Sequence, residues 1–288
     1  MRPTQLIITA DDFGLSLEIN EAVEQAHREG VLTCASLMVT GPAAADAIRR
    51  AEAMPALGVG LHLALLDAPS ARPVAEIPDL LAPDGLYLGR RSVWLGTRLM
   101  LLARIREQVR SEMRAQFDLF TRTGLPMDHV NGHWHFHQHP VVAALLANEF
   151  APAFGIHAVR APREPILAAW RAAGRHHLSG RAVVDLWNAA LWRAAEWRMR
   201  GASFASNDWF YGLNDGGAVT PDRLLGFIQN LPPGVTEIGV HPAIAPPTGP
   251  FAPPSSWRGP DELQALLDPA VIAACRDIPR IRFSDIAR

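Results

Sequence analysis

Short apolar runs bounded by turn or polar residues recur along the whole chain. They are Leu6–Ala10, Ser36–Thr40, Leu57–Leu63, Met127–Asn131, Ile156–Arg160, Thr236–His241 and Ile281–Phe283. Each has the length of a buried strand. Stretches with apolar residues at helical spacing lie between several of them, at Ser16–Glu29, Ala43–Ala53, Arg104–Thr123 and Val141–Phe150. Strands that alternate with helices predict a parallel sheet and an α/β protein.

The number of predicted strands favours a distorted, TIM-like β/α barrel over a doubly wound sheet. Acids follow the first strand in place of a Gly-x-Gly turn, so no glycine-rich phosphate loop is predicted there. A length of 288 residues lies near the upper limit for one hydrophobic core. We therefore expect a single domain over residues 1–288.

Two segments interrupt the alternation of strands and helices. Ile166–Gly201 is rich in Ala, Trp and Arg, and the apolar spacing of Ala182–Arg200 predicts an amphipathic helix. We expect a helical insertion in the barrel at about residues 163–201. The second segment, Pro242–Pro260, is dense in proline and predicts an ordered loop or a lid.

Composition excludes several classes of function. The formal net charge is −2, which argues against a nucleic-acid partner held by bulk charge. Arginine supplies every basic side chain other than histidine, so lysine Schiff-base chemistry is excluded. Two cysteines are too few for a disulfide scaffold, and no apolar stretch is long enough to span a membrane. The cytoplasm is the expected location.

Acids or imidazoles follow four of the predicted strands. Asp11 and Asp12 follow the first strand, and His62, His133 and His241 stand at the ends of three others. In a β/α barrel the carboxyl ends of the strands converge on one face, where active sites lie. The shared position predicts one site built from all of these residues.

The residue types allow a division of roles. Asp11 and Asp12 taken alone are equally typical of a helix N-cap. Two adjacent carboxylates after a strand point in different directions, so one can bind a metal while the other accepts a proton from water. Imidazole and carboxylate ligands suit Zn, Co, Mn or Fe. His62 alone is also explained as a core histidine.

A run of alternating histidines begins at His133 and continues through His135, His137 and His139. An extended segment would place all four imidazoles on one side. The alternative is an exposed histidine-rich loop that binds metals adventitiously. We expect His135, His137 and Arg160 to contact substrate, although Arg160 could instead orient Asp11. His241 could protonate a leaving group or bond to a backbone carbonyl.

Four motifs resemble those of the YdjC-like carbohydrate deacetylases. They are Thr9–Ser16 with its Asp-Asp-Phe-Gly-Leu-Ser string, Gly60-Leu61-His62, the histidine cluster His133–His137, and Glu237–Pro242 with its Glu-x-x-x-His-Pro pattern. The resemblance runs over nearly the whole chain, and the four motifs in this order are specific to the family.

The resemblance implies a distorted β/α barrel that removes acetyl groups from N-acetylated amino sugars. It implies that Asp12, His62 and His133 bind a divalent metal, with magnesium the ion commonly placed there. It also implies that Asp11 is the general base and that His241 is the acid or stabilises the oxyanion. Asn131-Gly132 stands where relatives commonly have Asp-Ser, and Trp134 replaces a histidine.

The Asn-Gly-His form and the Trp/Arg-rich insertion resemble the subgroup associated with hopanoid biosynthesis. The substrate implied is an N-acetylglucosaminyl hopanoid, and the alternative is a soluble chito-oligosaccharide. A phosphoesterase with the same ligands and a non-catalytic, membrane-associated partner in lipid assembly are further alternatives. The insertion suits either peripheral contact with the inner face of the membrane or two helices packed on the barrel. The sequence does not determine the oligomeric state and is compatible with a homodimer.

Overall fold

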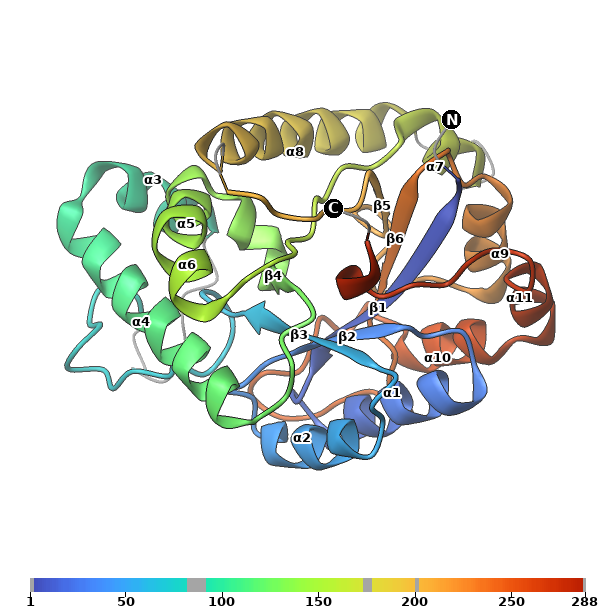
Figure 1. The fold of residues 1–288 in the computed structure, drawn as a ribbon, viewed down its shortest axis with the longest axis horizontal. Coiled ribbons are helices and arrows are strands. Elements are labelled where there is room, and N and C mark those ends of the chain that lie inside the picture. Colours follow the sequence, from blue (N-terminus) through green and yellow to red (C-terminus); the bar gives the residue numbers. More distant parts are fainter. Residues whose placement is uncertain (1–2, 82–91, 173–177, 200–201, 287–288) are drawn as a thin grey trace.

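The centre of the protein is a curled sheet of six parallel strands (Figure 1). The computed structural model describes residues 3–81, 92–172, 178–199 and 202–286. The strands follow the order β4-β3-β2-β1-β6-β5 across the sheet. Their bounds are β1 Gln5–Phe13, β2 Cys34–Leu37, β3 Gly58–Leu63, β4 Val130–Gly132, β5 Trp209–Tyr211 and β6 Val235–Val240. Because all are parallel, their carboxyl ends lie at one edge.

Helices surround this sheet. They are α1 Leu17–Glu29, α2 Ala44–Glu52, α3 Ser92–Leu101, α4 Ala103–Arg122, α5 Pro140–Leu145, α6 Ala151–Phe154, α7 Ile166–Ala172, α8 Leu178–Arg198, α9 Pro221–Gln229, α10 Gly259–Leu267 and α11 Pro269–Ala274. Short helical turns occupy η1 His133–Gln138, η2 Leu146–Phe150 and η3 Phe283–Asp285. Within the described residues, no helix is long and apolar enough to cross a membrane.

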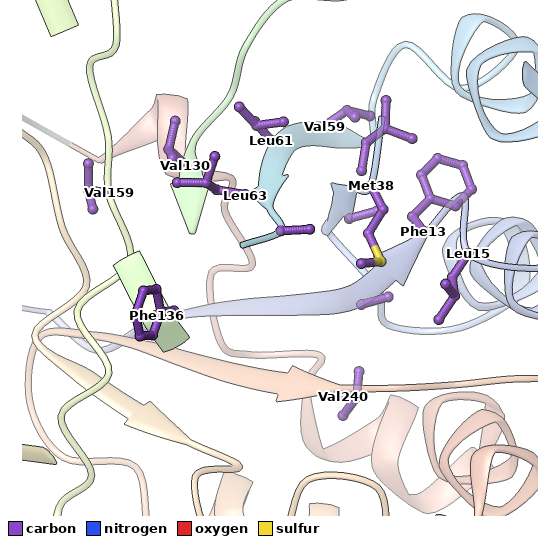
Figure 2. Packing of buried hydrophobic residues seen from close by; sticks show 14 of the residues in the cluster. Phe13, Leu15, Met38, Val59, Leu61, Leu63, Val130, Phe136, Val159 and Val240 are labelled. Carbon is purple, nitrogen blue, oxygen red and sulfur yellow. The ribbon is translucent and has the colours of Figure 1, made fainter. Parts of the chain in front are cut away.

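Alternation along each strand separates an apolar face from a polar one. Val59, Leu61 and Leu63 of β3 join the main hydrophobic core, and Figure 2 shows them with Phe13 and Val130. The intervening positions of β1, β2, β3 and β6 face the other way, because side chains alternate along a strand. These positions carry the buried polar side chains Asp11, Ser36, His62 and Glu237. The interior of the curl is therefore polar toward the carboxyl ends of the strands.

Capping residues explain where the helices beside the site begin. The Ser16 hydroxyl accepts a hydrogen bond from the Ile19 amide and starts α1 directly after the Asp-Asp turn. Thr220 caps α9 in the same way, with Pro221 at the first helical position. His139 caps α5 through its ring nitrogen, which lies 3.3 Å from the Val141 amide. These caps fix the loops that carry the functional residues.

The predicted TIM-like barrel is confirmed only as a curled, all-parallel half-barrel. The predicted strand Ile156–Arg160 makes only isolated bridges, Val159 to Val130 and Ala158 to Ala205. The Asn207 side chain bonds both the amide and the carbonyl of Ala161, which ends regular pairing there. Strand β5 was not predicted, because its apolar run is only three residues long.

The prediction of a strand at Ile281–Phe283 is wrong. The amide of Ile281 bonds the Leu6 carbonyl beside β1, but the chain then turns into η3. Asp285 explains the turn, because its carboxylate accepts a hydrogen bond from the Arg282 amide. The remaining predicted strands match β1, β2, β3, β4 and β6 with shifted ends.

Both segments that interrupt the alternation have the local structure that the sequence predicts. The insertion forms α7 and α8, and α8 lies against α5 and α7 along the top of Figure 1. Trp192 and Ala195 of α8 are buried, which is the packing expected of an amphipathic helix. The proline-rich segment is an irregular loop up to the start of α10 at Gly259. That this chain is one domain stays a prediction.

Candidate active site

Asp11 and Asp12 lie near the carboxyl end of β1 and point to different surroundings. Asp12 adopts a left-handed backbone conformation with φ of 62°, which aspartate tolerates better than most residues. Its side chain borders the cavity at the carboxyl edge of the sheet. Asp11 instead bonds to Arg160 inside the curl. The predicted divergence of the two carboxylates is present.

Three predicted metal ligands meet at the carboxyl edge. Asp12 Oδ1 lies 3.3 Å from His62 Nε2 and 3.0 Å from His133 Nδ1, and the two ring nitrogens are 3.4 Å apart. All three side chains are buried. Burial alone would raise the pKa of Asp12, but His133 and then His62 lower that pKa below the usual carboxyl range. Asp12 is therefore an anion held between two imidazoles.

This donor set fits a divalent ion. Asp12 Oδ1 receives no hydrogen bond of acceptable geometry from the part of the chain that is described. Buried oxygens in proteins normally have a partner, and a metal ion supplies one. His62 Nδ1 lies 2.7 Å from Asn131 Oδ1, which leaves His62 Nε2 free of its proton for coordination. Two imidazoles and a carboxylate suit Zn, Co or Mn.

Arg160 holds Asp11. Its guanidinium donates to both oxygens of Asp11, at 2.6 and 2.9 Å, and to Glu237 Oε1 at 2.7 and 2.9 Å. Burial alone would raise the pKa of Asp11, but Arg160 and then His62 keep it well below the usual carboxyl range. The Arg160 side chain is fully buried. Of the two predicted roles of Arg160, the geometry favours orienting Asp11 over contacting substrate.

His241 follows β6, as predicted, and borders a second cavity that Asp12 also borders. Its ring lies 4.2 Å from that of Trp257, and its buried Nδ1 has no hydrogen-bond partner in the described structure. Burial lowers the pKa of His241, and the carboxylate of Asp12 only partly opposes this shift. The Glu262 carboxylate accepts a hydrogen bond from the backbone amide of His241. His241 is thus a neutral imidazole with a fixed backbone and an unused ring nitrogen.

The remaining histidines of the cluster do not share one side. Trp134 and His135 have φ of 51° and 53°, so the segment coils into η1 instead of extending. The ring of His135 packs on Phe210 at 5.2 Å, and burial lowers its pKa well below the usual range. His137 Nε2 bonds the carbonyl of Arg160 at 3.0 Å, and burial lowers its pKa to about 3. Of the four histidines in the cluster, only His133 lies beside Asp12 and His62.

Two adjoining cavities open beside Asp12. One of about 350 Å³ is bordered by His133 and Trp134, and one of about 270 Å³ by His241. Both are also bordered by Asp12 and by the same part of the proline-rich loop, including Trp257. The rings of Trp134 and Trp257 lie 6.0 Å apart. The loop therefore forms one wall of a cleft with an aromatic pair at its mouth.

Sequence reasoning missed Ser36 and Trp257. Ser36 Oγ lies 2.8 Å from Asn131 Nδ2, inside the curl. Its position in the apolar run Cys34–Leu37 was the available signal, because a polar residue on the inner face of a buried strand requires a polar partner. Trp257 lies in a loop without periodicity, and nothing in the sequence places it beside His241.

Comparisons with known proteins identify relatives over nearly the whole chain. A family model described as YdjC-like protein matches residues 5–277. A carbohydrate deacetylase of Geobacillus stearothermophilus is 32% identical over 94% of this chain and 92% of its own length. A carbohydrate deacetylase of Mus musculus is 31% identical over 93% of this chain and 90% of its own length.

The fold is shared with a solved structure as well. The crystal structure of an Enterococcus faecalis V583 protein superposes with a TM-score of 0.72 at 22% identity, covering both chains completely. This likeness concerns the fold alone. The match of the family model over nearly the whole sequence, with its motifs gathered at one edge of the sheet, shows that the chain belongs to the YdjC-like family.

Proposed function

We propose that this chain is a metal-dependent carbohydrate deacetylase that hydrolyses the N-acetyl group of an N-acetylglucosamine-type sugar. One observation carries the proposal: three buried ligand atoms converge beside an ionised second carboxylate and an unpaired imidazole. Relatives that align over more than nine-tenths of the chain are named carbohydrate deacetylases. Hydrolysis of an amide requires an electrophile, a base and a proton donor.

Asp12, His62 and His133 would hold the ion. A divalent ion at this position supplies a Lewis acid that polarises the acetyl carbonyl and promotes ionisation of water. The donors support zinc, cobalt or manganese over magnesium, because magnesium prefers oxygen ligands and water. The base and the proton donor come from the chain itself.

Asp11 is the proposed base. Water adds to the acetyl carbon, and its proton passes to Asp11, which Arg160 holds as an anion in a fixed orientation. The carbon–nitrogen bond then breaks, and the sugar nitrogen takes its proton from His241. Because burial keeps His241 neutral, it must be protonated during turnover, by transfer of the proton that Asp11 has taken from water. The acetic acid that leaves carries the second proton of that water and ionises to acetate. The products are acetate and a free amine.

The aromatic pair is the proposed sugar platform. Trp134 is 49% exposed at the mouth of the larger cavity, and Trp257 lies between it and His241. Aromatic faces supply apolar contact, while the hydroxyl groups of a sugar ring stay directed toward water. Stacking of the ring there would place its acetamido group next to the predicted ligands.

The finer proposal is a lipid-linked substrate, an N-acetylglucosaminyl hopanoid. Its support is the outer face of α8, where Val183, Leu186, Trp187 and Trp197 are 56% to 69% exposed. At helical spacing these residues form one stripe, and the exposed Arg193 and Arg198 flank it. Apolar residues with tryptophan and flanking arginine suit the surface of an anionic bilayer. We propose peripheral contact between this face and the membrane.

Mass spectrometry separates the substrates. The zinc- or cobalt-loaded protein is incubated in parallel with an N-acetylglucosaminyl hopanoid and with diacetylchitobiose, and the loss of an acetyl group is measured. Deacetylation of the hopanoid supports the lipid-linked substrate, and turnover of chitobiose alone supports a soluble one. Release of acetate from neither would contradict the proposed function.

Membrane contact has its own test. Wild-type protein should sediment with vesicles that contain phosphatidylglycerol, and a Trp187→Ser, Trp197→Ser double variant should remain in the supernatant. Both tryptophans point away from the body of the protein, so the variant should keep its thermal stability. Equal sedimentation of the two proteins would remove the α8 outer face from the proposal.

A further inference from the structure

A continuous chain of hydrogen bonds crosses the polar interior of the curl. Its far end is Asp128, which precedes β4 at the amino edge of the sheet. From there the chain passes through His129, Ser36 and Asn131, all fully buried, and it reaches His62 at the predicted metal site. Each link is 3.0 Å or shorter.

The direction of each bond follows from its neighbours. Asp128 Oδ2 accepts from His129 Nδ1, and the imidazole tautomer with its proton on Nδ1 presents Nε2 as an acceptor. The Ser36 hydroxyl therefore donates to His129 Nε2. Having used its proton, Ser36 Oγ can only accept, and the group facing it is Asn131 Nδ2. The acid at the far end thus determines the direction of the whole chain.

The hydrogen bonds at the His62 end of the chain give the same orientation of the Asn131 amide. The second amide hydrogen of Asn131 points to Asp11 Oδ1, at 3.1 Å. With both amide hydrogens used, Asn131 Oδ1 faces His62 Nδ1 as an acceptor. His62 must then carry its proton on Nδ1, which leaves Nε2 unprotonated, 3.3 Å from Asp12 Oδ1. This is the tautomer that coordination through Nε2 requires.

We propose that Asp128, His129 and Ser36 form a positioning relay that fixes the amide of Asn131 and, through it, the tautomer of His62 and the orientation of Asp11. These residues touch neither substrate nor ion; they act through Asn131. Because the network is buried, water cannot replace a missing hydrogen-bond partner. Loss of any one link therefore leaves a buried polar group unsatisfied, which destabilises the fold. The proposal rests on the proposed function, because the benefit of the relay is a ready metal ligand.

The competing explanation is that Asp128, His129 and Ser36 only stabilise the fold. Asp128 also accepts hydrogen bonds from the amides of Phe283 and Ser284, so it tethers η3 to the sheet. A purely structural role predicts changes in unfolding temperature and nothing else. A positioning role predicts changes at His62, several bonds away, and changes in metal affinity.

Ser36→Ala is the informative variant, because it removes one oxygen and breaks the relay at its centre. Cys34→Ala is the matched control: it alters the same strand and removes the thiol 3.5 Å from Asp128 Oδ2, but it breaks no link. Ser36→Thr restores the hydroxyl and should restore the wild-type behaviour. All three changes are made in the full chain.

The first measurement needs no metal. In the metal-free protein labelled with ¹⁵N-histidine, long-range proton–nitrogen spectra report which ring nitrogen of His62 carries the proton. They are recorded at alkaline pH, where an imidazole ring is neutral. Wild type, Cys34→Ala and Ser36→Thr should show one form, protonated on Nδ1 and slow to exchange with water. Ser36→Ala should show faster exchange at Nδ1 and a second tautomer.

The second measurement is the dissociation constant for Zn²⁺ alone. Ser36→Ala should bind Zn²⁺ about tenfold more weakly than wild type, the range found when a partner of a ligating histidine is lost. Both other variants should stay within about twofold. Unchanged Zn²⁺ affinity and unchanged His62 spectra in Ser36→Ala would overturn the relay. If wild type binds no Zn²⁺, the proposed function fails, while the His62 spectra still decide the relay.

Discussion

Two clusters of acid and histidine side chains lie inside the same curl, at opposite edges of the sheet. Asp12, His62 and His133 meet at the carboxyl edge, and Cys34, Asp128 and His129 meet at the amino edge. Both triads are buried, and in both the possible ligand atoms lie within 4.8 Å of one another. Residue type and proximity alone do not distinguish them.

Hydrogen bonding does distinguish them. At the amino edge, both oxygens of Asp128 accept bonds from His129 and from two backbone amides. Burial, and next the charge of Asp128, raises the pKa of the Cys34 thiol well above its usual value, which disfavours the thiolate that a metal requires. At the carboxyl edge, Asp12 Oδ1 lacks a donor and borders a cavity. Ligand atoms that lack a hydrogen-bond partner and border a cavity indicate the functional site. Ligand atoms that already have hydrogen-bond partners and border no cavity indicate a supporting role.

The largest expected effect is at the carboxyl edge. Asp12→Asn should reduce deacetylation by more than about 10⁴-fold, because it removes the anionic ligand and several kcal/mol of charge stabilisation. Asparagine tolerates the left-handed conformation, so the turn should persist. Acetate release and bound metal are measured together, with Cys34→Ala as the control. Full activity in Asp12→Asn would invalidate the contrast between the two edges.

The buried ion pairs of Arg160 should contribute more to stability than any surface ion pair. Arg160→Met leaves the carboxylates of Asp11 and Glu237 buried without their cation, which should cost about 3–5 kcal/mol of unfolding free energy. Arg49→Met is the control, because Arg49 pairs with Asp46 at the surface and its loss should cost below about 1 kcal/mol. Urea denaturation measures both. Equal costs for the two variants would contradict the role of Arg160.

Loss of the acid at the amino edge should lower stability in a pH-dependent way. Burial alone would raise the pKa of Asp128, but its bonds to His129 and then to Ser284 lower it. A depressed carboxyl pKa stabilises the fold above the ordinary value of about 4, and this contribution is lost as pH falls. Asp128→Asn should therefore cost about 2 kcal/mol at pH 7 and less below pH 4. A deficit that does not change with pH would argue against an ionised Asp128.

The smallest expected effect is at the mouth of the cleft. Trp257→Ala should raise KM for an N-acetylated sugar about tenfold, about 1.4 kcal/mol, by removing one aromatic face. Trp257→Phe keeps an aromatic face and should change KM less. Initial-rate kinetics separate KM from kcat for both. A fall in kcat without a rise in KM would indicate that Trp257 positions His241 instead of the sugar.

Much of the site was predictable from residues at the ends of strands. The strand periodicity located Asp11, Asp12, His62 and His241, because parallel strands gather their carboxyl ends whatever the details of the barrel. The number of regular strands was not predictable. Residues 156–160 form only isolated bridges, and the chain directly after them is held by the distant side chain of Asn207, which no local pattern reports.

The histidine cluster shows where local reasoning fails. Alternation predicted four imidazoles on one side, but the positive φ angles of Trp134 and His135 divert the chain after His133. The sequence held a clue to the interior in Gly60, because a Cβ there would lie 2.6 Å from the ring of His129. That glycine can be interpreted only after the packing of His129 is known.

Anomalous diffraction from crystals grown with Zn²⁺ would show which of the two clusters binds a metal. Asp12 Oδ1 lacks a hydrogen-bond partner, whereas both oxygens of Asp128 have one. This difference predicts one anomalous peak, bounded by Asp12 Oδ1, His62 Nε2 and His133 Nδ1. It predicts none among Cys34, Asp128 and His129. A peak at the amino edge, or no peak between Asp12 and the two histidines in protein that releases acetate, would contradict the account.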